Sequence, residues 1–267
     1  MSGRLKVLDL WVDPVDMEGA LERVRGFVEA GDGAHCVFAV NPEKNFSVPK
    51  DPELHRIFRE ADLLIPDGIG VVLGARILHG AKLKRVPGVE LMANVCRLSA
   101  ERGWGIFVFG AQEEVNRDAV AELERRYAGL RIVGRQDGYV QDDEMPDVVH
   151  RINSSGAQVL FLALGSPKQE KWYTTYRDQL STVRVVQGIG GSLDTITGAV
   201  KRAPAMWCRL GLEWLYRLLA EPTRVKRQKV LPLFVLRLAF EKAKRTLGAG
   251  TRQSTEELQK TGANKKK

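Results

Sequence analysis

LLIPDGIGVVL, at residues 63–73, is the stretch that decides how the fold is interpreted. Its first three residues are apolar and predict a short buried strand, which Pro66 ends because proline cannot donate to a ladder. Asp67 leaves the carboxyl end of that strand, and Gly68 and Gly70 let the backbone turn into an apolar helix. A carboxylate placed there in an open α/β sheet is a candidate for chemistry. The alternative is that Asp67 only caps the helix.

Strands and helices alternate on both sides of this stretch. The predicted strands are 5–11, 35–40, 63–65, 105–109, 130–133, 158–164 and 183–186, and the predicted helices are 16–30, 51–61, 69–78, 89–102, 113–127 and 142–154, with another from 168. This alternation predicts an α/β fold with a mostly parallel, Rossmann-like sheet flanked by helices. We expect an α/β domain over 1–203, an all-helical basic appendage over 204–247 and a disordered tail over 248–267.

The composition is that of an ordinary soluble protein, with 267 residues of which 44% are hydrophobic and 28% charged. No apolar run reaches the ~18 residues that span a bilayer, and acidic residues interrupt the N-terminal apolar stretch, so no signal peptide is predicted. Three scattered cysteines without a C-x-x-C pair indicate neither a zinc site nor a disulfide and suit a reducing cytosol. We therefore predict no metal and no cofactor.

Charge is distributed unevenly along the chain. Residues 200–267 hold 17 basic and 5 acidic side chains, against 24 basic and 28 acidic in residues 1–199. Such a tail suggests an anionic partner, namely lipid head groups, pyrophosphate or nucleic acid. Its mixture of aromatic and basic residues suits an anionic membrane surface, although helices packed on the domain with solvated arginines would have the same pattern. Arg217, Arg224 and Arg227 would share a helix face and could clamp a pyrophosphate.

Five polar or glycine-rich loops follow predicted strands, at 41–44, 67–70, 110–112, 165–170 and 187–191. In a parallel sheet these loops meet at one edge, where ligands bind. The glycine-rich loops at 165–167 and 188–191 can present backbone N–H groups to phosphate, although any single glycine is explained by a turn alone. The candidate residues in these loops are Asn41, Asp67, Gly68, Gly110, Ser166, Gln169, Gly188 and Gly190. The spacing G-x-G-x-x-x-G at 68–74 departs from the dinucleotide fingerprint, so an NAD(P) site is not expected.

Seven motifs in order resemble those of the WecG/TagA/CpsF glycosyltransferases, glycosyltransferase family 26, over about residues 5–240. They are NPEK at 41–44, PDGIGVV at 66–72, RVPG at 85–88, QDGYV at 136–140, LGSPKQE at 164–170, GIGGSLDTITGAVKRAP at 188–204 and GLEWLYRLLAEPTRVKRQ at 211–228. The resemblance implies an inverting, metal-independent transferase. It would move a sugar from a UDP-sugar to a polyprenyl-diphosphate-linked sugar during bacterial surface-polysaccharide synthesis. It also implies a peripheral protein on the inner face of the cytoplasmic membrane that can form a homo-oligomer and has no nucleic-acid partner.

The resemblance assigns roles by position. Asp67 is similar to the general base, Asn41 and Gln169 to hydrogen-bonding residues of the active site, and Arg85 to the arginine of the R-x-x-G motif near the donor. The set Arg217, Arg224 and Arg227 matches arginines of the C-terminal appendage that would close the site on the diphosphate.

Two positions depart from the usual pattern of the family. Ala39 stands where the family usually has threonine, and Glu90 where it usually has aspartate. The lost hydroxyl fits a sugar other than N-acetylmannosamine or its uronic acid, for instance glucose. Two alternatives are a nucleotide-sugar oxidoreductase on a Rossmann-like sheet and a non-enzymatic module that binds anionic surfaces through its tail.

Overall fold

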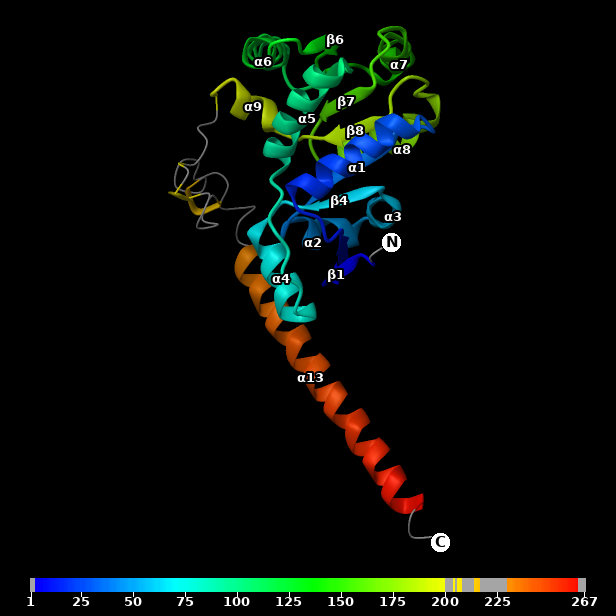
Figure 1. Ribbon diagram of the computed structural model, residues 1–267, viewed down its shortest axis with the longest axis vertical. Helices are drawn as coiled ribbons and strands as arrows, with labels where there is room; N and C mark the ends of the chain where they lie inside the picture. The colour runs from blue at the N-terminus through cyan, green and yellow to red at the C-terminus, as the bar shows by residue number, and fades with distance from the viewer. Residues whose placement is uncertain (1–2, 200–203, 205, 208–213, 217–229, 264–267) are drawn as a thin grey trace.

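The computed structural model describes residues 3–199, 204, 206–207, 214–216 and 230–263, with 247–263 described as backbone only. These residues form a six-stranded sheet with helices on both faces, a separate two-stranded hairpin and one long C-terminal helix (Figure 1). The predicted fold class, a mostly parallel α/β sheet flanked by helices, is confirmed.

The six strands all run parallel. They are β3 (His35–Val40), β4 (Leu63–Pro66), β5 (Gly105–Gly110), β6 (Arg131–Gln136), β7 (Val159–Ala163) and β8 (Val185–Gly188), in the order β4-β3-β8-β7-β5-β6. Each hydrogen-bonded pair of neighbours is parallel. Strands buried on both faces are continuous apolar runs rather than alternating ones, which is why the sequence marked most of them to within a few residues.

Helices connect the strands and cover both faces of the sheet. They are α1 (Met17–Ala30), α2 (Lys44–Ser47), α3 (Pro52–Glu60), α4 (Ile69–His79), α5 (Gly88–Arg102), α6 (Glu113–Arg126), α7 (Met145–Ser154), α8 (Lys168–Tyr176) and α9 (Ser192–Ile196), with short 3₁₀ turns η1 (Val48–Lys50), η2 (Asp142–Glu144) and η3 (Arg177–Gln179). Two aspartates cap the helices that they precede, at the helix starts predicted from the sequence. Asp16 accepts from the N–H of Gly19 at 3.1 Å, and Asp51 accepts from Glu53 and Leu54, each at 3.1 Å.

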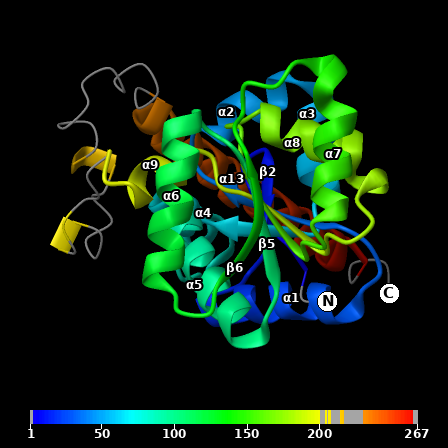
Figure 2. The ribbon, with the colours of Figure 1, turned by 90° about the horizontal axis from the view of Figure 1, so that it is seen from above.

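Two separate cores lie on the two faces of the sheet. On β3, Val37 belongs to one core while Phe38 belongs to the other, because successive side chains of a strand point to opposite faces. The core with Val37 packs against α1, α5, α6 and α9, and the core with Phe38 packs against α3, α4, α7, α8 and the hairpin. Figure 2 shows α5, α6 and α9 on one side of the sheet and α3, α7 and α8 on the other.

The N-terminal segment differs from the prediction. The sequence predicted one strand over 5–11, and this is wrong: β1 (Leu5–Val7) and β2 (Leu10–Val12) form an antiparallel hairpin. Leu8 takes a left-handed conformation with φ of 55°, which turns the chain within two residues. The turn allows Val7 and Leu10 to bury completely in the same core, and that gain outweighs the strain at Leu8.

The helix α13 (Val230–Ala263) lies beside α4 and then extends away from the domain (Figure 1). Its buried residues Phe234 and Leu238 face Gly70 and Gly74 of α4, where the missing side chains let the two helices approach closely. The helix passes residue 248, where the sequence predicted a disordered tail, and the division of the chain at 204 and 248 stays a prediction. Among the described residues, no helix has the length and apolarity required to cross a lipid bilayer.

Candidate functional site

The carboxyl ends of four adjacent strands bring most of the candidate residues to one edge of the sheet. Asn41 follows β3, Asp67 follows β4, Ser166 follows β7, and Gly188 ends β8. Since β4, β3, β8 and β7 are neighbours in that order, the predicted convergence of these loops at one edge is confirmed. Gly110 ends β5, one strand further along the sheet.

The RVPG segment wraps around the end of β4 and holds Asp67. The N–H of Val86 donates to the carbonyl of Pro66 at 2.9 Å, and Nε of Arg85 donates to the carbonyl of Asp67 at 2.6 Å. The N–H of Gly88 donates to Oδ1 of Asp67 at 3.1 Å. Arg85, predicted to lie near the donor, therefore contacts the backbone of the candidate base.

Asp67 is not the cap of the helix that follows it. The N-cap of α4 is Gly68, which has no side chain to accept a hydrogen bond, while the Asp67 carboxylate accepts from the first residue of α5. A carboxylate at a helix N-terminus is stabilised as an anion. Asp67 is partly buried at the edge of the sheet, neither enclosed in the core nor fully exposed.

The loop that carries Asn41 packs closely against the turn after Asp67 because residue 68 is a glycine. A Cβ on Gly68 would lie 2.8 Å from Cδ of Pro42 and 3.2 Å from Cβ of Asn41, so any side chain there would force the two loops apart. The Asn41 side chain accepts from the N–H of Lys44 at 3.1 Å, which fixes the loop after β3. The loops that follow β3 and β4 are thus packed against each other.

Two buried charges lie behind this edge, and neither was predicted from the sequence. Lys44 is 8% exposed and Glu170 is fully buried, and the Lys44 ammonium donates to Oε1 of Glu170 and, at 3.1 Å, to Oγ of Ser166. The ammonium also lies 4.6 Å from the ring centroid of Phe58. The pair ties the loop after β3 to the turn after β7. Both residues stood inside quoted motifs, but nothing in a sequence marks a charged side chain as buried.

Gln169 is bound at both ends of its amide. Nε2 donates to Oε1 of Glu170 at 3.3 Å, and Oε1 accepts from the N–H of Gly190 at 3.1 Å. A Cβ on Gly188 would lie 2.5 Å from this amide, so glycine is required there. The Gly190 N–H, which we expected to face a phosphate, is thus donated to a protein side chain.

Gly110 has a structural explanation. Its φ is 122°, and a Cβ there would lie 2.4 Å from the carbonyl carbon of Ala163 on β7. Its own carbonyl accepts from Nδ2 of the buried Asn116 at 2.8 Å. The close approach of β5 to β7 accounts for this glycine without a ligand.

Three of the candidate arginines, Arg217, Arg224 and Arg227, lie outside the described residues, so their place at the site stays a prediction. Within the described ranges, no three His, Cys, Asp or Glu side chains group in a way that could hold a metal ion.

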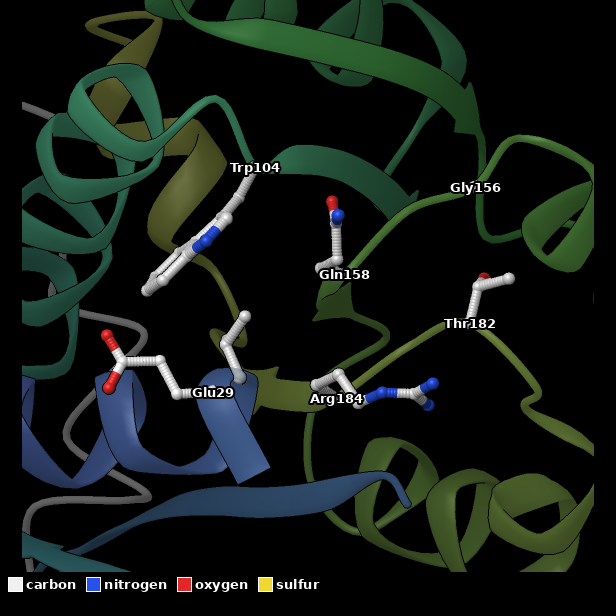
Figure 3. Close-up of a pocket in the computed structure, with 7 residues that line it drawn as sticks. Glu29, Trp104, Gly156, Gln158, Thr182 and Arg184 are labelled. Carbon is white, nitrogen blue, oxygen red and sulfur yellow. The ribbon is translucent and has the colours of Figure 1, made fainter. Parts of the chain in front are cut away.

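A hollow of about 470 Å³ opens at the opposite, amino edge of the sheet (Figure 3). Its lining includes Trp104, Gln158, Thr182 and Arg184, which precede β5, β7 and β8, together with Glu29 at the end of α1. None of the candidate residues lines it. This hollow and the convergence of polar groups are therefore at different edges.

An open, all-parallel sheet whose polar loops converge at the carboxyl ends of its strands defines the class to which this molecule belongs, the α/β proteins that bind substrates at that edge. Comparison with known proteins identifies the family. The model of the glycosyl transferase WecG/TagA/CpsF family matches residues 5–248. The chain belongs to this family and is a glycosyltransferase.

Two Bacillus proteins are among its relatives. Both are named N-acetylglucosaminyldiphosphoundecaprenol N-acetyl-β-D-mannosaminyltransferase. The one from Bacillus subtilis strain 168 is 36% identical over 79% of this chain and 81% of its own. The one from Bacillus spizizenii is 34% identical over 78% and 80%. A crystal structure of 2,3-dimethylmalate lyase matches 80% of this chain and 99% of its own at 14% identity with a TM-score of 0.24, too low to support an argument.

Proposed function

We propose that this glycosyltransferase moves a hexose or hexosamine-type sugar from a UDP-sugar to a polyprenyl-diphosphate-linked sugar, with inversion at the anomeric carbon, in bacterial surface-polysaccharide synthesis. The observation that carries the proposal is the Asp67 carboxylate, held by the Gly88 N–H at the substrate-binding edge of the sheet. The names of the two relatives, which describe transfer of an N-acetylmannosaminyl group to an undecaprenyl-diphosphate-linked acceptor, support it.

The proposed reaction is a single displacement. The acceptor hydroxyl attacks the anomeric carbon as Asp67 takes its proton, and the bond from that carbon to the UDP oxygen breaks with its electron pair going to UDP. Arg85 and helix N-terminal N–H groups meet the developing charge, and the arginines at 217, 224 and 227 would close over the diphosphate. We assign no metal ion and no cofactor to this step.

A carboxylate stabilised as an anion is a weak base, and the proposed mechanism has to overcome this. Closure over the site would remove water from around Asp67, which favours the neutral form and so strengthens the base. The partial burial of Asp67 in the described structure is consistent with a side chain that further closure could desolvate.

A donor panel tests the reaction. Purified protein is incubated with individual UDP-sugars and a polyprenyl-diphosphate-linked N-acetylhexosamine, with and without a chelator. We expect UDP release that requires both substrates and survives chelation, and a product of inverted anomeric configuration by NMR. A nicotinamide absorbance change without UDP release would instead favour the oxidoreductase.

We also propose that α13 lies on an anionic membrane surface at the inner face of the cytoplasmic membrane. Leu233, Leu236 and Phe240 repeat at i, i+3 and i+7 and are 51%, 67% and 72% exposed, and the exposed Lys244 follows on the same side of the helix. An apolar stripe beside basic residues is typical of a helix that lies in a membrane interface. Self-association, expected from the family resemblance, stays a prediction.

Sedimentation with anionic vesicles tests this surface. The double change Leu236→Ser and Phe240→Ser should release most of the protein, because both side chains leave the stripe. Val235→Ser is the matched control, since Val235 is 65% exposed on another face of the same helix. Equal loss of binding in the control would show that the stripe is not the contact.

A further inference from the structure

Gln187 is a polar side chain in an apolar layer. It is 1% exposed on β8, and its neighbours in register are Val37 of β3 and Phe161 of β7, both fully buried. All three side chains lie on the face that packs against α1 and α5. A buried amide in such a layer is unfavourable unless it makes hydrogen bonds.

The amide of Gln187 reaches the start of α5. Its Nε2 donates to the carbonyl of Gly88 at 3.1 Å, and the N–H of the same glycine donates to Oδ1 of Asp67 at 3.1 Å. A carbonyl only accepts, so the amide nitrogen must be the atom that faces Gly88. In the described part of the chain, Oε1 of Gln187 has no hydrogen-bond partner. The bond that Gln187 does make therefore goes to the residue that holds Asp67.

We propose that Gln187 is a positioning residue for the transfer reaction. It fixes residue 88 through the Gly88 carbonyl, so that the N–H of the same residue holds the Asp67 carboxylate in the orientation that accepts the proton. The backbone of Asp67 is held separately, by its N–H to the carbonyl of Val40 at 3.1 Å and by Nε of Arg85 at its own carbonyl. Gln187 thus controls the carboxylate and not the loop. This inference rests on the proposed role of Asp67 as the base.

Gln187→Met in the full chain is the test, because methionine keeps the length of the side chain and removes the donor. We expect kcat to fall on the order of 10- to 100-fold, since small misplacements of a reacting group are costly. KM for both substrates should stay unchanged. Thermal stability should not fall, because the unpaired Oε1 leaves the apolar layer together with the amide.

The pH profile separates positioning from a structural role. Without the Gly88 N–H in place, the Asp67 anion loses a donor, and the acidic limb of kcat/KM moves to higher pH. The charged groups nearby, Arg85 at the Asp67 carbonyl and Glu90 in the first turn of α5, are the same in the variant. A structural role alone would lower the amount of folded enzyme and leave the limb in place.

Two further variants complete the experiment. Gln158→Met is the matched control, because Oε1 of Gln158 accepts from the N–H of Gly105 at 2.7 Å at the amino edge, away from Asp67. We expect no shift of the acidic limb of kcat/KM in this variant. Gln187→Asn, too short to reach Gly88, repeats the test if Gln187→Met does not fold. Near-normal turnover of Asp67→Asn would refute the proposed role of Asp67 as the general base. An inactive Asp67→Asn together with wild-type kcat and acidic limb in Gln187→Met would overturn the positioning role alone.

Discussion

Two aspartates bracket β4, and their surroundings differ. Asp62 comes just before the strand, where Oδ1 contacts Nδ1 of His35 at 3.1 Å and Oδ2 accepts from the N–H of Cys36 at 2.9 Å. The Tyr173 hydroxyl lies 3.5 Å from Oδ2 and donates to the carbonyl of Ala34 at 2.7 Å. Asp67 comes just after the strand, where the Gly88 N–H holds it. Aspartate thus joins β4 to β3 at the amino edge, and at the carboxyl edge it contacts the start of α5, where we propose that the substrate binds.

Neither Cys36 nor Tyr173, which lie beside Asp62 at the amino edge, is ionised at neutral pH. Burial raises the pKa of the Cys36 thiol and of the Tyr173 hydroxyl, so both stay protonated at neutral pH. The direction of the strands decides which end carries chemistry, because in open parallel sheets ligands bind at the carboxyl ends. The role of an aspartate beside a strand therefore depends on which end of the strand it occupies, and so on the direction of the sheet.

The same substitution at both aspartates should have opposite effects on activity and stability. We expect Asp67→Asn to lower kcat by about 10²–10⁴-fold with little change in stability, because asparagine still accepts from Gly88 but cannot take a proton. Asp62→Asn should lower the free energy of unfolding by about 1–3 kcal/mol, because buried donors lose part of their acceptor. UDP release and denaturant unfolding measure the two effects. Equal activity losses per folded molecule would refute the contrast.

The carboxyl edge also contains the buried ion pair of Lys44 and Glu170, and Lys44→Met breaks it. The change leaves Glu170 fully buried without its cation, so we expect the free energy of unfolding to fall by about 3–5 kcal/mol. Lys171→Met is the control. Lys171 contacts Asp51 at 2.7 Å and Glu53 at 3.0 Å and is 38% exposed, and its loss should cost less than about 1 kcal/mol. Similar losses in urea unfolding of the two variants would contradict the buried role.

A smaller change at the carboxyl edge should alter donor choice alone. Ala39 lies beside Gly88: the Cβ of Ala39 is 4.0 Å from the position that a Cβ on Gly88 would occupy. Ala39→Thr places a hydroxyl beside the residue that holds Asp67. We expect the ratio of kcat/KM between UDP-glucose and UDP-N-acetylmannosamine to shift on the order of 10-fold toward the latter. An unchanged ratio in the donor panel would show that residue 39 does not contact the sugar.

The smallest expected effect lies at the amino edge, where His35 is placed between two carboxylates. Burial opposes the charged imidazole, but hydrogen bonds to Asp32 and Asp62 raise the pKa of His35 above its usual value. Its contribution to stability is therefore fully present below about pH 6.5, the usual value, and is lost as the pH rises through the raised pKa.

We expect the free energy of unfolding to fall by less than about 1 kcal/mol as His35 loses its proton, because Asp32, its partner, is largely exposed. Urea unfolding between about pH 6 and pH 8 measures it. His35→Gln removes the titrating ring and should flatten this part of the curve, while the Asp67 variants should leave it as it is. A slope that survives in His35→Gln belongs to another group.

The sequence predicted the elements whose signal is local. Apolar runs such as 35–40 and 105–109 predicted the strands. The polar loops after the predicted strands contained Asn41, Asp67 and Gln169. Helix starts at Asp16 and Asp51 followed from side chains that accept from backbone N–H groups a few residues later. Asp67 as a cap of its own helix was wrong because the chain needs one more residue, Gly68, to turn past Pro42.

The contacts that were not predicted join distant parts of the chain. Lys44 and Glu170 are 126 residues apart, and their burial depends on how β3 and β7 are arranged around β8. Gln187 had no local signal that it would reach Gly88, since the partner is a backbone carbonyl on another element. The turn at Leu8 required a conformation that leucine rarely adopts, so the pattern favoured one longer strand.

The C-terminal helix α13 extends well beyond the part that contacts α4, which makes its far end suitable for attaching a probe. Its 34 residues extend about 51 Å at 1.5 Å per residue, and Phe234 near its start packs at Gly70, three residues after Asp67. Side-chain contacts with α4 continue to Arg245, whose guanidinium donates to the Leu78 carbonyl at 3.2 Å. A fluorophore or a surface linker attached near residue 260 would thus sit tens of ångströms from the reacting edge, and shortening the chain to residue 246 would leave the docked part of the helix in place.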